Sequence, residues 1–211
     1  MTQRQTGHSP APAHPQPSRA RPVADSARSD ILAAAAVLFY ARGFTAVGMD
    51  DLRTEANVSL RRLYQLFPSK DLLIEEVLGI WRDAWSSGID AQVQAAADPR
   101  QRLLAVYDFL AGWFTSEGFR GCAFINSFGE VGGASGRITT IVREQKKHFQ
   151  DYLADLATEL GAPPGLAPQL AILAEGAITT AAIAASSEPA RQARAAAEVL
   201  IGVALSPAAR D

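Results

Sequence analysis

The sequence has few of the residues that build metal sites, disulfide frameworks and catalytic centres. It contains a single cysteine, Cys122, and three histidines, of which His8 and His14 stand in a proline-rich N-terminal stretch. One cysteine excludes an internal disulfide framework and a cysteine-rich zinc site. His148 and Glu144 supply two potential ligands, too few for a metal site, and no Ser/His/Asp set for nucleophilic catalysis can be assembled. We therefore expect no metal, no cofactor and no enzymatic activity.

The sequence also lacks a long apolar run and a strong charge of either sign. The best candidate for a membrane span, residues 177–185, is short and interrupted by threonine, and the first residues lack the apolar core of a signal peptide. We therefore expect a soluble, cytoplasmic protein that does not enter a membrane. The formal net charge is -2, so a nucleic-acid partner would have to be bound by locally placed basic side chains.

Helical periodicity dominates the rest of the chain, and no strand pattern or internal repeat is present. The sequence predicts an all-α fold with an N-terminal three-helix domain at residues 25–69, a helical C-terminal domain at residues 70–205 and a tail at residues 206–211. Residues 1–24 are rich in proline and contain arginine but no acidic residue, which predicts a disordered basic arm. This arm either adds contacts to DNA phosphates or is a passive tail.

Apolar spacing, caps and breakers divide the chain into helices. Asp98 followed by Pro99 is typical of a helix start, and Gly43 and Gly161 stand just past the ends of two apolar stripes. The expected helices cover residues 26–42, 49–56, 59–66, 70–97 and 100–115, a short piece within 118–136, and residues 138–160, 166–186 and 189–205.

Residues 44–73 are the segment around which the rest of the chain is organised. The pattern predicts two short helices joined by a tight turn at Asn57 and Val58. Asn57 tolerates the left-handed backbone of such a turn, Gly48 stands at the cap of the first helix, and Ser59 is a natural N-cap for the second. This arrangement is a helix-turn-helix, whose second helix can lie in the DNA major groove.

A longer pattern runs through the same segment. Its members are residues 40–44, Met49, Asp51, Leu52, Ala56, Val58, Ser59, Leu63, Tyr64, Phe67 and residues 69–73. The pattern resembles the DNA-binding domain of the TetR family of bacterial repressors. The chain departs from that family at positions that concern base specificity and not the fold: Gly48 stands for the usual Thr, Arg53 for Ala, Asn57 for Gly, Arg61 for a small residue and Leu66 for Tyr or His.

The resemblance implies double-stranded DNA as a partner, bound at a palindromic operator by a homodimer. Side chains on the second short helix are free to face base edges, where arginine can bond to guanine, glutamine to adenine, and leucine can contact a thymine methyl. Tyr64 and Lys70 match the family's phosphate-contacting positions, whereas Arg53 either contacts phosphate or is merely solvated. The predicted DNA-binding residues are Gly48, Met49, Ser59, Leu60, Arg61, Arg62, Tyr64, Gln65 and Lys70.

The C-terminal domain is rich in aromatic residues, and the resemblance implies that some of them line a ligand cavity. We expect a small apolar or aromatic effector there, although a core position is the simpler explanation for any one aromatic residue taken alone. The predicted lining residues are Trp81, Trp85, Trp113, Phe124, Phe128 and Tyr152. The candidate polar groups that would orient the effector are Asn126, Glu130, Thr139 and His148.

The last two predicted helices are rich in small residues, among them Gly176, Ala181, Ala193 and Ala197. Helix faces made of small residues allow two helices to approach closely. This composition therefore fits either packing within one chain or a four-helix interface between two copies. The family resemblance favours a homodimer formed through these two helices.

Cys122 lies in residues 120–126, a segment similar to a Gly-Cys segment in a subset of TetR-like regulators, a few of which sense electrophiles. Arg120 nearby would favour a reactive thiolate, but a lone cysteine among phenylalanine and isoleucine is commonly a small buried apolar residue. We expect a regulator, most simply a repressor, that a small effector releases from its operator. The alternatives are a thiol-based sensor at Cys122 and an all-helical enzyme or small-molecule carrier.

Overall fold

The structure, a computed structural model, describes residues 23–206. The predicted arm up to residue 22 and residues 207–211 of the predicted tail lie outside this part. Within it the chain forms nine α-helices and no strand, which confirms the predicted all-α fold. The helices are α1 (Val23–Arg42), α2 (Met49–Glu55), α3 (Leu60–Leu66), α4 (Lys70–Gln94), α5 (Pro99–Phe114), α6 (Ala123–Val131), α7 (Gly136–Glu159), α8 (Leu166–Ala184) and α9 (Glu188–Ala204).

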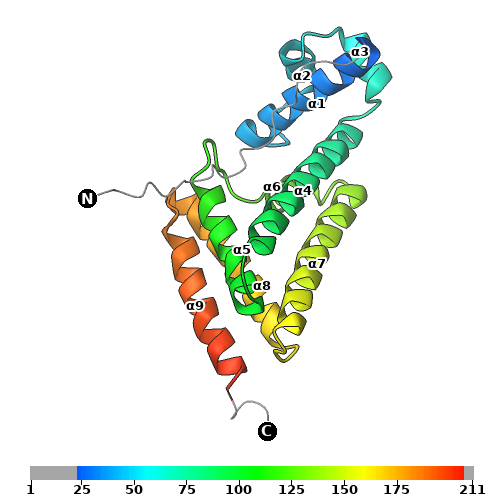
Figure 1. Ribbon diagram of the computed structural model, residues 1–211. Helices are drawn as coiled ribbons and strands as arrows, with labels where there is room; N and C mark the ends of the chain where they lie inside the picture. Colours follow the sequence, from blue (N-terminus) through cyan, green and yellow to red (C-terminus); the bar gives the residue numbers. More distant parts are fainter. Residues whose placement is uncertain (1–22, 207–211) are drawn as a thin grey trace, which may run out of the picture.

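The first three helices form a small domain at one end of the molecule (Figure 1). One face of α1 buries Ile31 and Phe39 in a core shared with Leu52 of α2 and Leu63 of α3. α1 begins three residues earlier than predicted, at the limit of the described part. Its end is set by Gly43, whose φ of 88° lies in the left-handed region that favours glycine.

The joints of the helix-turn-helix have the local chemistry expected from the sequence. Asn57 adopts a left-handed backbone with a φ of 52° between α2 and α3. At the start of α3 the Arg62 amide donates to the Ser59 hydroxyl at 3.2 Å, and before α2 the Gly48 amide donates to the Asp51 carboxylate at 2.8 Å. Caps satisfy backbone donors that the first turn of a helix leaves unpaired, so each short helix begins at a defined residue.

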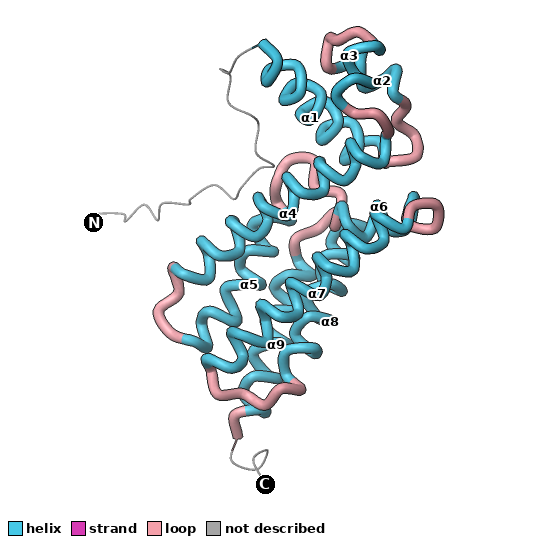
Figure 2. Tube along the Cα trace, turned by 90° about the vertical axis from the view of Figure 1, so that its right-hand side faces the viewer, coloured by secondary structure: helices cyan, strands magenta, loops and turns pink. Residues whose placement is uncertain are grey.

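α4 leads from the small domain into a bundle made of α4 to α9 (Figures 1 and 2). α5 runs through the middle of this bundle and packs against α4, α7, α8 and α9. Residues 103–107 of α5 are all buried. The buried Tyr107 hydroxyl also has a hydrogen-bond partner in this core, because it donates to the Leu170 carbonyl of α8 at 2.8 Å.

α8 corrects one expectation from the sequence. The whole of Leu166–Ala184 is long and apolar enough to cross a membrane by length and composition, with a mean hydropathy of 1.4, whereas the sequence pattern suggested residues 177–185 alone. Of this segment 44% is buried inside the structure, where α8 packs against α7 and α9. A helix that packs one face against the core of a folded domain can have the same composition, and α8 packs in this way against its neighbours.

Candidate functional site

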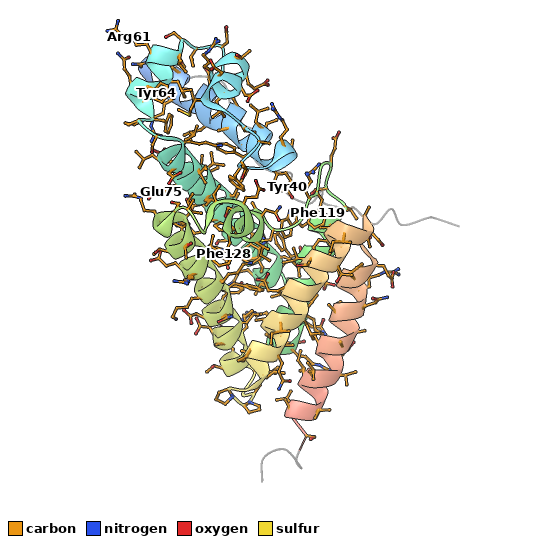
Figure 3. All side chains as sticks on the ribbon, turned by 180° about the vertical axis from the view of Figure 1, so that it is seen from behind. Tyr40, Arg61, Tyr64, Glu75, Phe119 and Phe128 are labelled. Carbon is orange, nitrogen blue, oxygen red and sulfur yellow. The ribbon has the colours of Figure 1, made fainter. Side chains whose placement is uncertain are left out.

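α3 lies at the surface of the small domain, with Arg61 and Tyr64 at the end of the molecule (Figure 3). Its buried side chain is Leu63, which anchors the helix to the core. The exposed residues are Leu60, Arg61, Tyr64 and Gln65, and Arg62 is half-buried. The helix therefore presents its polar face outward, which is the geometry that contact with base edges requires.

The predicted DNA contacts around α2 differ in accessibility. Gly48 and Ser59 are exposed, whereas Met49 is half-buried against the core of the small domain. Arg53 donates through Nε to the Asp50 carboxylate at 2.7 Å. This arginine is therefore paired with an acid of its own helix, which leaves less of its charge for a phosphate.

The start of α4 contributes the remaining predicted contact. The Ser69 hydroxyl accepts a hydrogen bond from the Leu72 amide at 3.2 Å and caps the helix. Lys70 follows it, and partial burial lowers the pKa of Lys70, while the carboxylates of Glu130 and Asp71 oppose that change. Lys70 is thus placed near an acid of α6, a link between distant segments that spacing along the chain does not reveal.

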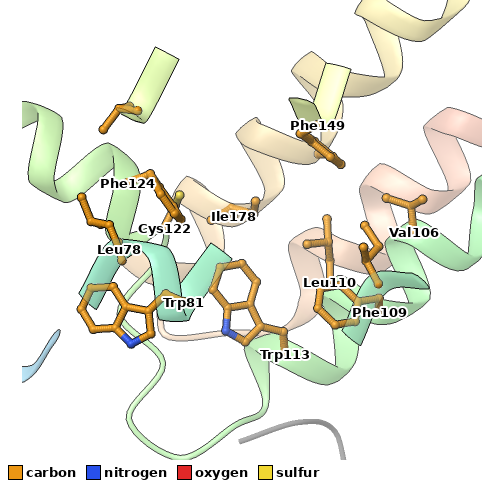
Figure 4. Packing of buried hydrophobic residues seen from close by; sticks show 14 of the residues in the cluster. Leu78, Trp81, Val106, Phe109, Leu110, Trp113, Cys122, Phe124, Phe149 and Ile178 are labelled. Carbon is orange, nitrogen blue, oxygen red and sulfur yellow. The ribbon is translucent and has the colours of Figure 1, made fainter. Parts of the chain in front are cut away.

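A pocket in the bundle contains about 730 Å³ of space not filled by protein atoms, including the part open to solvent. Of the six predicted lining residues, Trp81, Trp85, Trp113 and Phe124 do line it. Figure 4 shows Trp81, Trp113 and Phe124 among the buried residues of this region. Phe109 and Phe149 complete an aromatic wall that the sequence did not single out. Trp85 meets both rings edge to face, with centroids 5.8 Å and 5.1 Å away. Walls of this kind suit a flat apolar ligand.

The other two predicted lining residues do not face the pocket. Phe128 is 48% exposed on α6 (Figure 3), because the first turn of this short helix faces the pocket and Phe128 lies one turn further along. Tyr152 lies three positions beyond Phe149 on α7, outside the pocket wall. Burial, together with the Asp90 carboxylate, raises the pKa of Tyr152. Helical spacing identifies an inward face but not which turn of that face borders a cavity.

The polar groups expected to orient an effector have other roles. None of the four candidates lines the pocket in the part of the chain that the structure describes. Asn126 donates to the Arg120 carbonyl at 3.3 Å, and Thr139 donates to the Gly132 carbonyl at 2.8 Å. His148 is exposed on α7. Glu130 contacts the small domain instead.

A polar cluster that the sequence did not suggest stands in the pocket wall. Lys146 of α7 donates to both carboxylate oxygens of Glu175 in α8, at 2.8 Å and 2.9 Å, and its Nζ is 3.3 Å from the Cys122 sulfur. Burial alone would lower the pKa of Lys146, but the Cys122 and Glu175 side chains outweigh it and raise that pKa. The sequence contains one signal of this cluster, because Glu175 is an acidic residue in the otherwise uncharged α8.

Gln145 is another polar residue of the wall. Its side chain is 6% exposed, and its Oε1 atom is buried with no hydrogen-bond partner among residues 23–206. A buried carbonyl oxygen without a partner costs free energy, so its presence beside a pocket calls for a physical reason. Gln145 adjoins Lys146 on the face of α7 that also carries the buried Val142 and Phe149, which a helical projection of the sequence could have shown.

Tyr40 joins the pocket to the small domain. It belongs to α1, yet it lines the pocket, and its ring lies edge to face with Trp81 at 5.8 Å. Its hydroxyl donates to the Gly121 carbonyl at 3.1 Å and accepts from the Arg120 amide at 2.9 Å. Burial raises the pKa of Tyr40. The segment before α6 is thereby fastened to the end of α1, near the position of Phe119 (Figure 3).

Glu130 makes a second contact between the domains from the other end of α6. Its carboxylate accepts a hydrogen bond from the Thr45 amide at 2.9 Å, just after α1. The same carboxylate covers Gly43, since a Cβ there would lie 2.9 Å from a Glu130 oxygen. Glu130 of α6 therefore bonds to the small domain just after α1, and the segment before α6 bonds to Tyr40 within α1.

Comparisons with known proteins agree with this architecture. Residues 31–77 match the family model for bacterial regulatory proteins of the tetR family. The chain is 38% identical over 100 residues to the HTH-type transcriptional activator FasR of Mycolicibacterium smegmatis. That match covers 46% of this chain and 45% of the activator, less than half of its length.

Two solved structures extend the likeness to most of the chain. A TetR-family transcriptional regulator from Streptomyces coelicolor superposes with a TM-score of 0.81 at 25% identity, over 86% of this chain and 97% of the other. The reduced form of NemR from E. coli gives a TM-score of 0.72 at 25% identity, over 81% and 94%. The likeness therefore includes the helical bundle and not the small domain alone.

Proposed function

We propose that this chain, which belongs to the TetR family of bacterial transcriptional regulators, binds double-stranded DNA and responds to a small effector in the pocket. The proposal rests on one observation: Tyr40 belongs to the helix-turn-helix domain and lines the aromatic pocket. A ligand in the pocket thus touches the domain that carries α3. The family consists of regulators and not of enzymes, which sets the enzymatic alternative aside.

In this proposal α3 enters the major groove. Arg61 and Arg62 supply the guanidinium groups that bond to guanine, Gln65 suits adenine, and Leu60 is exposed for contact with a thymine methyl. Tyr64 and Lys70, with the region of Gly48, Met49 and Ser59, would contact the phosphate backbone and fix the position of the helix.

The proposed assembly is a homodimer through α8 and α9. Both helices expose large apolar side chains: Ile172 is 73% exposed, Ile183 83%, Val199 65% and Val203 61%. Burying this face against its copy removes apolar area from water and gives a four-helix interface. Twofold symmetry would then place two α3 helices about 34 Å apart, in successive major grooves of a palindromic operator.

The effector would act by changing this spacing. A ligand shifts a conformational equilibrium only as far as it prefers one state, so the effector must bind the DNA-released state more tightly. In this proposal the ligand-free dimer occupies the operator and acts as a repressor. Its location is the cytoplasm. Because the relative from Mycolicibacterium smegmatis is an activator, a promoter fusion assayed with and without the protein measures the sign of regulation separately.

The first test is binding of the purified protein to the DNA upstream of its own gene at two salt concentrations. Arg61→Ala/Tyr64→Ala should abolish competitor-resistant binding, and wild-type affinity should fall with salt because phosphate contacts release counterions. Glu144→Ala, an exposed change on α7, is the control that should bind normally. Absence of any specific site in a genomic DNA selection would refute the proposal.

A second candidate function is electrophile sensing by Cys122, which the 3.3 Å contact between Lys146 Nζ and the Cys122 sulfur favours. The Lys146 ammonium lies where it can donate a hydrogen bond to the sulfur as the thiol reacts. A conjugated carbonyl compound would add to it: an S–C bond forms as the C=C π bond breaks, and the thiol proton ends on the carbon next to the carbonyl. No oxidant is consumed.

Cys122→Ser separates the two candidates. If the thiol is the sensor, wild-type protein gains the mass of the electrophile and leaves the operator, whereas the serine variant does neither and still responds to reversible ligands. An unchanged response of the variant removes the thiol function and leaves the effector function in place.

A further inference from the structure

The charged groups of the pocket are already paired with one another. The Lys146 ammonium has three N–H donors, and its three contacts are the two Glu175 oxygens and the Cys122 sulfur. Lysine and glutamate carry opposite charges, so together they leave the pocket without net charge. A charged effector would have to break this pair or remain without a counterion in an aromatic wall, and both are costly.

The hydroxyl of Tyr40 is also occupied. It donates to the Gly121 carbonyl and accepts from the Arg120 amide. An effector that bonded to this hydroxyl would have to displace a contact between the two domains. Tyr40 therefore offers a ring surface to the ligand, together with Trp85 and Phe149, and not a free polar group.

Gln145 differs from these residues. It lines the same pocket, it is more than nine-tenths buried, and its Oε1 has no hydrogen-bond partner among the described residues. The terminal torsion of a glutamine is soft, so the amide can turn this unpaired oxygen towards a ligand donor at small cost. A ligand donor would satisfy an atom that the folded chain leaves unpaired.

We propose that the effector is an uncharged ring compound with one hydroxyl or N–H group, which pairs with the Gln145 amide while the ring lies among the tryptophans. The proposal rests on the proposed function, because it takes this pocket as the effector site. Phenols and comparable ring alcohols, lactams and anilines belong to the class. Carboxylates and quaternary amines of similar size do not, since the pocket has no unpaired charge for them.

The test compares 4-propylphenol with its methyl ether, 4-propylanisole, which keeps the ring and cannot donate. All three tryptophans of the chain line the pocket, so intrinsic fluorescence reports on it directly. We expect the phenol to bind roughly tenfold more tightly, as one hydrogen bond to an otherwise unpaired buried group predicts. Gln145→Met, similar in volume and unable to pair, should bring the two affinities close to equality.

Gln150→Met is the matched control, because Gln150 is exposed on the same helix and its loss should keep the preference. Equal binding of phenol and ether by wild-type protein would overturn the inference while leaving the effector pocket in place, and so would a preference that persists in Gln145→Met. Tighter binding of 4-propylbenzoate than of the phenol would also overturn it. If no compound alters the fluorescence but operator binding is intact, the pocket itself is not the effector site.

Discussion

Gly43 is the residue at which backbone conformation and a contact between domains act together. Its φ of +88° is one that side chains rarely adopt, and an added Cβ would lie 2.9 Å from the Glu130 carboxylate. Gly118 has a similar φ of +74° but nothing within 4 Å of the added atom. Comparing alanine substitutions at Gly43 and Gly118 therefore separates the cost of the left-handed backbone from the cost of the Glu130 contact.

Gly118→Ala should lower the free energy of unfolding by about 1–2 kcal/mol, the usual cost of a left-handed alanine. Gly43→Ala should cost about 1 kcal/mol more, because Glu130 must move and the Thr45 amide then loses its acceptor. Urea denaturation of both variants measures the difference. Equal losses would show that the Glu130 contact adds nothing.

Tyr107 gives a prediction for alkaline pH. Burial raises the pKa of its hydroxyl above the ordinary value of 10.0. Above that pH the unfolded chain has released a proton that the folded chain still holds, so the stabilisation is complete below pH 10.0 and declines as pH rises, by about 1.4 kcal/mol per pH unit. The free-energy difference between wild type and Tyr107→Phe should therefore shrink above pH 10.0.

Chemical denaturation at several pH values measures this difference. Tyr64→Phe is the control, since Tyr64 is 46% exposed and its hydroxyl has no buried partner to lose. A Tyr107→Phe difference that stays constant across the alkaline range would contradict the expectation.

At the scale of elements, α6 contacts both the pocket and the DNA-binding domain. Its first turn supplies Phe124 to the pocket, and its last turn supplies Glu130 to the Thr45 amide and to the surroundings of Lys70. α4 adds an ion pair with α7, in which Arg137 Nε donates to the Glu75 carboxylate at 3.1 Å. That pair is exposed and contributes little to stability.

Glu130→Ala should therefore uncouple the two sites. Effector affinity should stay within about twofold of wild type because Glu130 does not line the pocket. The effector's influence on operator affinity, typically 5- to 150-fold or about 1–3 kcal/mol in coupled systems, should fall. Operator titrations with and without effector measure it, with Glu144→Ala as control. A variant that releases DNA as fully as wild type would exclude α6 as the connection.

For the whole molecule, the decisive feature is the apolar outer face of α8 and α9. Ile183→Glu places a charge on the proposed interface, at the last turn of α8, where desolvation on dimer formation is costly. We expect a monomer by analytical ultracentrifugation at concentrations where wild type is a dimer, and a loss of operator affinity of at least tenfold, because one α3 then binds alone. The change is at a side chain that is 83% exposed, so the monomer should stay folded.

Val37→Glu is the control for that experiment. Val37 is 62% exposed on α1, away from α8 and α9, so its variant should remain dimeric. If Ile183→Glu also remains a dimer, the interface lies elsewhere on the molecule.

Sequence patterns predicted the helices with small errors, including the two short helices of the helix-turn-helix. The errors at helix ends are one to a few residues, as at α4, which ends at Gln94 and not at residue 97. The pocket was predicted less well. Trp81 and Phe124 face it as expected, but Phe128 is exposed and Tyr152 lies beyond it, because equal helical spacing does not distinguish one turn from the next.

The sequence by itself determined where helices start and stop, the left-handed turn at Asn57 and the caps at Ser59 and Asp98, because such features depend on residues within one helical turn. Tertiary structure alone decided that Tyr40 reaches the segment before α6 and that Lys146 meets Cys122. These contacts join residues 24 to 81 positions apart. Their geometry follows from how long helices pack, and no local pattern in the chain encodes it.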